Sequence, residues 1–120
     1  HAFNLDTWQD KSGAQFEAGH EFWGFVPPAL FDKLALAVRP TNQFMFDGTP
    51  VVKDVIFSRN LSSSSSSSEM GTVLLAAVRG APAFVALDVT YPEKPAFLWQ
   101  RSFGYTGDTV GTPTIAQVTG

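Results

Sequence analysis

One phrase occurs twice in this chain: a Gly-Thr-Pro turn that leads into an apolar strand. The first copy, "GTPVVKDV", spans Gly48 to Val55, and the second, "GTPTIAQV", spans Gly111 to Val118. Glycine permits a tight turn into a crowded strand, and proline is tolerated at a strand start because no ladder donor is needed there. Two such entrances in 120 residues predict a chain built from repeated sheet units.

A second pair of similar segments follows the same order along the chain. The segments "HAFNLDT" (1–7) and "EFWGF" (21–25) parallel "VALDVTYPEKPAFLWQR" (85–101), and each copy ends in a strand centred on a tryptophan, Trp23 or Trp99. Four-stranded units repeated every few tens of residues are typical of β-propeller blades, because one such unit cannot cover both of its faces. We expect each tryptophan to pack between successive units and to bury on the order of 200 Å².

The segments between turn residues are predicted to be short strands, because they are rich in β-branched and aromatic residues. They are 20–26, 43–46, 51–57, 72–78, 83–89, 96–103 and 114–118. Several are apolar on both faces, which indicates a sheet covered on both sides. One segment differs: Leu30, Leu34 and Val38 lie at helical spacing between prolines, which predicts a short helix from about Ala29 to Val38.

These patterns predict an all-β fold class. Residues 1–120 are expected to form a partial β-propeller segment, about one full four-stranded blade plus parts of two neighbours, with one short inserted helix. A propeller closes with about four to eight blades, so we expect a longer polypeptide, and His1 in place of an initiator methionine fits a processed or excised chain. The alternative is a self-contained small β domain, which would unfold in one sharp transition.

A serine tract, Ser62 to Ser68, interrupts the strand pattern. Such a tract has no apolar area to bury. We interpret residues 61–70 as a Ser-rich flexible loop between two strands. The other interpretation is that serine stands in for residues that were not identified.

Composition excludes several classes of function. The net charge is −3, and the eight Lys and Arg residues are scattered, which argues against nucleic acid as a partner. There is no cysteine, so no disulfide framework or thiolate metal site is present. The longest apolar runs are far shorter than the roughly 20 residues that span a bilayer, so no membrane-spanning helix is expected.

Oxygen-rich and imidazole side chains do not form a recognisable metal site. Asn4, Asp6 and Asp10 lack the alternating carboxylates, central glycine and terminal glutamate of a calcium-binding loop. His1 and His20 are the only histidines, and their spacing matches no zinc pair. Asp47 and Asp88 are interpreted as a turn carboxylate and a strand-end carboxylate, so no metal ligand is assigned.

No catalytic motif is present either: the chain has no nucleophile elbow, phosphate-binding glycine loop or Lys-Thr-Gly signature. Arg79-Gly80 resembles the start of an adhesive Arg-Gly-Asp tripeptide, but Ala81 replaces the carboxylate. No catalytic or cofactor-binding residue is therefore predicted, partner-binding residues stay unassigned, and the chain is not expected to be an enzyme.

Several phrases in order resemble the C-terminal β-propeller of the PilY/PilC family of type IV pilus biogenesis proteins and tip adhesins. The best anchors are the Pro27-Pro28 pair, "DGTP" at 47–50, "ALDVT" at 86–90 and Trp99. The match covers nearly the whole chain. It departs from the family pattern in a shortened glycine turn at 79–82, in the serine tract, and in an apparent insertion of Gly107-Asp108.

The resemblance implies a non-enzymatic component of a type IV pilus tip at the bacterial cell surface. It implies contact with minor pilins, support of pilus extension and twitching motility, and adhesion to host or abiotic surfaces. Calcium is implied for the family domain elsewhere, and no residue of this segment matches the calcium loop. The alternative is a quinoprotein-like propeller of the PQQ type, a dehydrogenase segment or an envelope scaffold, although the Thr-Gly turn of that repeat is missing after Asp88.

Overall fold

The computed structural model describes residues 1–36, 38, 48–58, 68–104 and 111–118. The expected strand at 43–46, Asp47, and residues 61–67 of the Ser-rich segment 61–70 lie outside the described residues, as does Gly107-Asp108.

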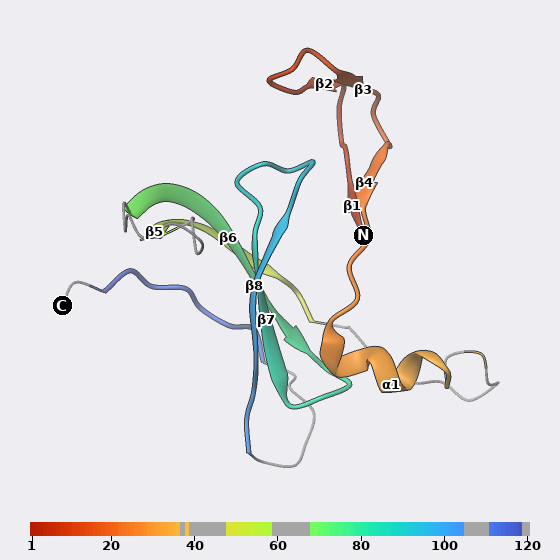
Figure 1. Ribbon diagram of the computed structural model, residues 1–120, viewed down its shortest axis with the longest axis vertical. Coiled ribbons are helices and arrows are strands. Elements are labelled where there is room, and N and C mark those ends of the chain that lie inside the picture. The colour runs from red at the N-terminus through yellow and green to blue at the C-terminus, as the bar shows by residue number, and fades with distance from the viewer. Residues whose placement is uncertain (37, 39–47, 59–67, 105–110, 119–120) are drawn as a thin grey trace.

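One four-stranded antiparallel sheet forms the centre of the structure (Figure 1). Its strands are β5 (Val51–Ser58), β6 (Ser68–Val78), β7 (Ala83–Asp88) and β8 (Ala96–Ser102), and each pairs with the next along the chain. The all-β class and the four successive strands predicted for a full unit are confirmed. Strand β6 begins at Ser68, within the segment 61–70 that was interpreted as a loop.

A second, smaller piece of sheet precedes it in the chain. Strand β1 (Ala2–Phe3) pairs antiparallel with β4 (Glu21–Trp23), and a further hairpin of β2 (Trp8–Gln9) and β3 (Gln15–Phe16) extends from their connection. Strand β4 is shorter than the predicted strand at 20–26. The β2–β3 hairpin was not predicted, and in Figure 1 it projects away from the central sheet.

The pairing register shows that the second pair of similar segments also has the same local structure. Ala2 lies opposite Trp23 in the β1–β4 pair, and Ala86 lies opposite Trp99 in the β7–β8 pair. Both pairs also contain a register irregularity beside the alanine. The β1–β4 hairpin therefore repeats β7–β8, with the β2–β3 hairpin inserted into its connection.

The predicted helix from Ala29 to Val38 is wrong in length. The chain forms a 3₁₀ turn at Pro28–Leu30 and then one short helix, α1 (Phe31–Leu34). Of the predicted apolar stripe only Leu30 is buried, whereas Leu34 is 44% and Val38 88% exposed. Since a helix this short has little intrinsic stability, it persists only where a buried residue anchors it, and that anchor is at its start.

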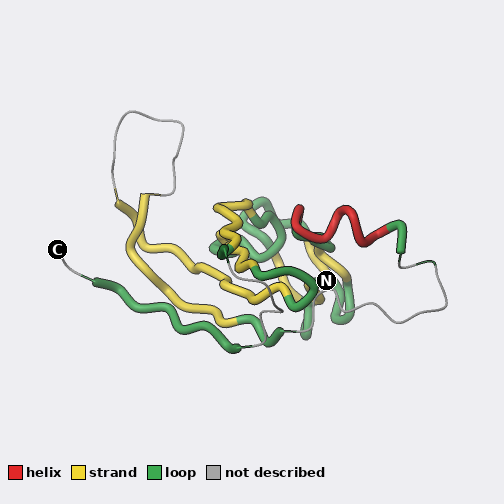
Figure 2. The backbone as a smooth tube through the Cα atoms, turned by 90° about the horizontal axis from the view of Figure 1, so that it is seen from below, coloured by secondary structure: helices red, strands yellow, loops and turns green. Residues whose placement is uncertain are grey.

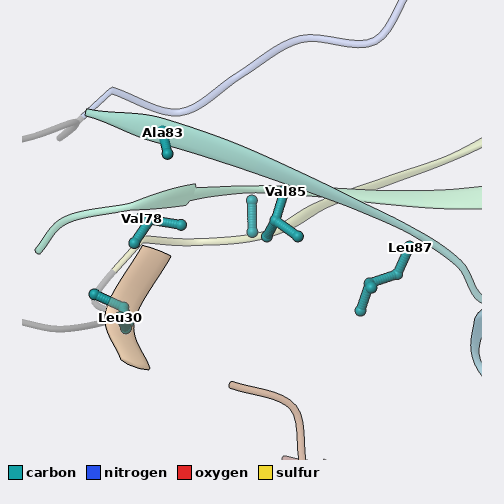
Figure 3. Packing of buried hydrophobic residues seen from close by; sticks show 6 residues of the cluster. Leu30, Val78, Ala83, Val85 and Leu87 are labelled. Carbon is teal, nitrogen blue, oxygen red and sulfur yellow. The ribbon is translucent and has the colours of Figure 1, made fainter. Parts of the chain in front are cut away.

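The core lies on one face of the central sheet. Leu30 packs there against Val78, Ala83, Val85 and Leu87, whose side chains point to the same side (Figure 3). The neighbouring positions on the opposite face, Ala77 and Ala86, have no exposed area either, so β7 and the end of β6 from Ala76 to Val78 are covered on both faces, as their apolar sequence predicts. Trp23 and Phe25 pack against the Leu30 side.

The predicted strand at 114–118 does not form. This segment runs beside the central sheet (Figure 2) and is joined to β5 through side chains instead of a backbone ladder. Lys53 Nζ donates to the Ile115 carbonyl at 3.0 Å, and the Ile56 N–H donates to Gln117 Oε1 at 2.9 Å. Each of these two bonds joins a backbone group to a side chain, so they do not form the backbone-to-backbone ladder of a strand pair.

Position 48 needs a glycine because of a close backbone approach and not because of the turn conformation that its motif predicts. A Cβ atom placed on Gly48 would lie 2.9 Å from the Ala77 carbonyl oxygen of β6, whereas one on Gly111 would meet nothing within 4 Å. Among the described residues only Gly13 and Gly19 have positive φ angles. Glycine at 48 therefore allows the chain to approach the sheet backbone closely.

We predict that Gly48→Ala in the full-length protein lowers the free energy of unfolding by about 1–3 kcal/mol, because a rigid backbone carbonyl must move to admit the methyl group. Urea unfolding measures the change. Gly104→Ala is the matched control, since a Cβ at Gly104 meets nothing within 4 Å. Equal stability of the two variants would contradict the close approach.

Candidate interaction site

Trp23 joins the N-terminal hairpin to the central sheet. Its ring belongs to the packing around the core and lines a hollow of about 120 Å³. The other residues that line this hollow are His1, Phe25, Pro50, Leu74, Val85 and Leu87. The indole Nε1 donates a hydrogen bond of 2.7 Å to the Pro92 carbonyl, in the connection between β7 and β8. One side chain thus provides both apolar contact and a directional bond between two units.

Trp99 occupies the matching position on the opposite face of the sheet. It lies opposite Ala86, and because side chains alternate along a strand, it faces away from Val85 and Leu87. It lines a hollow of about 200 Å³ together with Leu75, Phe84, Arg101, Phe103 and Pro113. Trp99 is 40% exposed, so the predicted burial between units is only partly reached within this chain.

Each hollow is lined by residues of both repeated sequence patterns. Trp23 shares its hollow with Pro50 of the first Gly-Thr-Pro copy, and Trp99 shares the other with Pro113 of the second copy. Each tryptophan therefore lies beside the Gly-Thr-Pro copy that follows it in the chain. The sequence predicted both motifs separately, and the structure shows that they form one repeated contact.

The repeat also contains a buried polar position after its inner strand. Asn4, directly after β1, and Asp88, the last residue of β7, occupy equivalent places, with exposed fractions of only 8% and 6%. The Asn4 amide donates to the carbonyls of Phe16 and Glu17 at 2.9 and 3.1 Å. Asp88 instead accepts from the backbone N–H and the hydroxyl of Thr90. Asp88 thus holds the turn that follows it, as expected of an Asx residue, whereas Asn4 holds the far end of the inserted hairpin, where β3 ends.

The β2–β3 hairpin carries its own small core. The rings of Trp8, Phe16, His20 and Phe22 contact one another with centroid distances of 5.2 to 5.9 Å. Lys11 at its turn lies 4.9 Å above the ring of Tyr91 in the β7–β8 connection, a cation–π contact between the two units. Sequence reasoning missed this element, although Asp10 to Gly13 between aromatic residues is a hairpin signal.

Asp10 closes the hairpin turn through hydrogen bonds of its carboxylate. Its Oδ1 accepts from the Ser12 hydroxyl at 2.6 Å and from the N–H groups of Ser12 and Ala14. The hydrogen bond from Ser12 is the main reason why the pKa of Asp10 is below its ordinary value. Asp6 accepts from the Thr7 N–H. Across the described ranges, no three His, Asp or Glu side chains are grouped closely enough to hold a metal ion.

The remaining singled-out residues have local roles. His1 Nδ1 lies 2.5 Å from a Glu21 carboxylate oxygen across the β1–β4 pair, and His20 belongs to the ring cluster. Arg79-Gly80-Ala81 lies in the turn between β6 and β7, where the Ala81 N–H donates to the Val78 carbonyl. None of the helices in the described part is long and apolar enough to cross a membrane.

We predict that Trp23→Phe lowers the free energy of unfolding of the full-length protein by about 1 kcal/mol, because it keeps an aromatic ring but removes the N–H donor to Pro92. Thermal or urea unfolding measures this loss. Trp8→Phe is the control, since Trp8 contributes ring packing on Phe16 and Phe22. A Trp23→Phe protein as stable as the wild type would show that the bond contributes nothing.

The chain is similar to three curated proteins of Pseudomonas aeruginosa strains, each called type IV pilus biogenesis factor PilY1. Two are 33% identical over 83% of this chain, and the third is 30% identical over 98% of it. The chain spans about 9% of the length of each. No family model matches, and no solved structure is significantly similar. The resemblance indicated by the ordered motifs is thereby confirmed.

Proposed function

We propose that this chain is a non-enzymatic segment of a type IV pilus biogenesis factor located at the pilus tip on the bacterial surface. In this role it supports pilus assembly and extension by contacting minor pilins, and it contributes to adhesion to host or abiotic surfaces. The observation that carries the proposal is the similarity to PilY1 factors over 83–98% of the chain. Their name describes biogenesis of a pilus and no catalytic activity.

Within that protein, we assign the chain to a β-propeller. The central sheet carries the preceding hairpin on one face and has Pro113 of the following segment beside Trp99 on the other. This is how one blade lies between two neighbours. A radius of gyration of 16.4 Å also exceeds the about 14 Å expected of a compact domain of this length, which favours a segment over a self-contained domain.

A propeller suits a component that is loaded during pilus extension. Radial packing leaves only short, protected strand edges, and each blade is held by a neighbour on either side. Here the connections across units include the Trp23 bond to Pro92 and the Lys11 contact with Tyr91. Force applied to one unit is therefore shared with the next.

The quinoprotein-like alternative is less well supported, because the three relatives are named as pilus factors. A direct measurement distinguishes it from the pilus role. Release of PQQ from the purified full-length protein, or dye-linked alcohol oxidation by it, would favour that alternative over a pilus role.

The blade assignment predicts the behaviour of Gly111→Ala. In this chain a Cβ at Gly111 meets nothing, whereas at Gly48 it meets the second strand of the unit it enters. If the second Gly-Thr-Pro copy enters another unit, Gly111→Ala should destabilise the full-length protein about as much as Gly48→Ala, by about 1–3 kcal/mol. Urea unfolding of both variants, with Gly104→Ala as control, tests this. A neutral Gly111→Ala would argue against a further unit.

The pilus role is tested in a bacterium that lacks the full-length gene. We expect loss of surface pili and of twitching motility, restoration by the wild-type gene, and failure of restoration by Val85→Asp. Val85 is 1% exposed, so an aspartate there would be buried without a partner. Ala18→Asp, at an exposed turn, is the matched control and should restore both properties. Normal piliation of the deletion strain would refute the proposal.

A further inference from the structure

Strand β1 is flanked by a strand on one side only. It pairs with β4, and no other strand lies beside it in the described part of the chain. Its counterpart β7 has β8 on one edge and β6 on the other, where Leu75 lies opposite Ala86 and Leu74 opposite Leu87. The β1–β4 hairpin therefore has the outer half of the repeat and lacks a counterpart to β5–β6.

The exposed fractions at equivalent positions show that apolar side chains at and after β1 are uncovered. Leu87 in β7 is 3% exposed, whereas Phe3, which takes its place in β1, is 56% exposed. Val89 is half-buried, and its counterpart Leu5 is 95% exposed. Asn4 and Asp88, by contrast, are equally buried. The local fold is therefore the same, and the apolar side chains of β1 lack a cover that their counterparts have.

A groove lies where that cover would sit. It has a volume of about 340 Å³ and runs between the β1–β4 hairpin and the β5–β6 part of the central sheet, with Phe3, Trp23, Val52 and Leu74 among its lining residues. Val52 pairs with Leu74 and Ile56 pairs with Met70, so all four side chains lie on the same face of the sheet. Val52, Ile56 and Met70 therefore extend the apolar surface of the groove along β5 and β6. Their exposed fractions are 55% for Val52, 51% for Ile56 and 63% for Met70.

We propose that the free edge of β1 and this groove bind an antiparallel β-hairpin from the same polypeptide, located N-terminal to His1. Its nearer strand pairs with β1 through backbone hydrogen bonds, and its apolar face covers Val52, Ile56 and Met70. This inference rests on the blade assignment above and adds which surfaces of this chain are interior.

The same polypeptide is the source because the equivalent pairing is local. Strand β6 reaches β7 through the short turn at 79–82, and a hairpin that pairs with β1 would need only a similar turn. The length of the relatives provides the chain for it, since the matched segment is 9% of each. The exposed apolar strip is also the surface that such a hairpin would need in order to bury its own apolar face.

The test compares thiol labelling at two positions in the full-length protein. Because a covered thiol reacts only when the structure opens locally, Phe3→Cys should react with a maleimide about tenfold more slowly than Ala18→Cys, or slower still. Ala18 is exposed at a turn outside the groove, and this segment has no native cysteine to compete. If Phe3→Cys does not fold, Leu5→Cys replaces it. Equal labelling rates would overturn the proposal.

A second measurement uses the native chain. Met70 should resist oxidation by hydrogen peroxide in the folded full-length protein and become reactive in urea. Protection that appears only after pilus components are added, or only at high protein concentration, would assign the cover to another chain and overturn the assignment to the same polypeptide. Since piliation is measured separately, rapid labelling with normal pili would reject this inference and leave the pilus role intact.

Discussion

The complete burial of small side chains on both faces of β6 and β7 is the constraint on which the rest of the structure depends. Ala76 and Ala77 are neighbours, so they face opposite sides of the sheet, and neither has exposed area. A methyl group can be covered fully only if another element comes very close. The core around Leu30 provides this on one face, and the approach of Gly48 to the Ala77 carbonyl shows how close the chain comes.

Sequence reasoning succeeded where each strand carries its own signal. Strands β5 to β8 are long enough to show β-branched and aromatic enrichment, and turn residues bound them, so their order and pairing could be predicted. The hairpin of β2 and β3 could not be recognised in the same way, because strands of two residues have no periodicity. The helix was overestimated since spacing alone does not reveal that Leu30 is buried whereas Leu34 and Val38 are exposed.

The candidate site was predictable in its parts but not in its assembly. Trp23 and Trp99 were expected to pack between units, but the proline beside each one follows only from the fold. The strand at 114–118 was predicted from composition, whereas a strand also needs a backbone ladder, and the bonds between β5 and this segment pair a backbone group with a side chain. Local preference determines which residues can form a strand, and neighbours determine whether they do.

The equivalent buried positions Asn4 and Asp88 show how one site in a repeat adapts to its loop. The inserted hairpin brings two carbonyl groups to position 4, and the Asn4 amide provides the donor that they need. The short connection after Asp88 presents the N–H and hydroxyl of Thr90, and the Asp88 carboxylate provides the acceptor that they need. An aspartate at position 4 would place a carboxylate against two carbonyl oxygens, with no donor to join them. The chemical difference between the copies is therefore a consequence of loop length and does not weaken the case for repetition.

The inserted hairpin has a further consequence. The contact between Lys11 and Tyr91 brings the β2–β3 hairpin to the rim of the central sheet that carries the β7–β8 connection. The inserted residues therefore lie outside the buried face around Leu30. A reporter or epitope could be grafted into the β2–β3 turn without disturbing that packing.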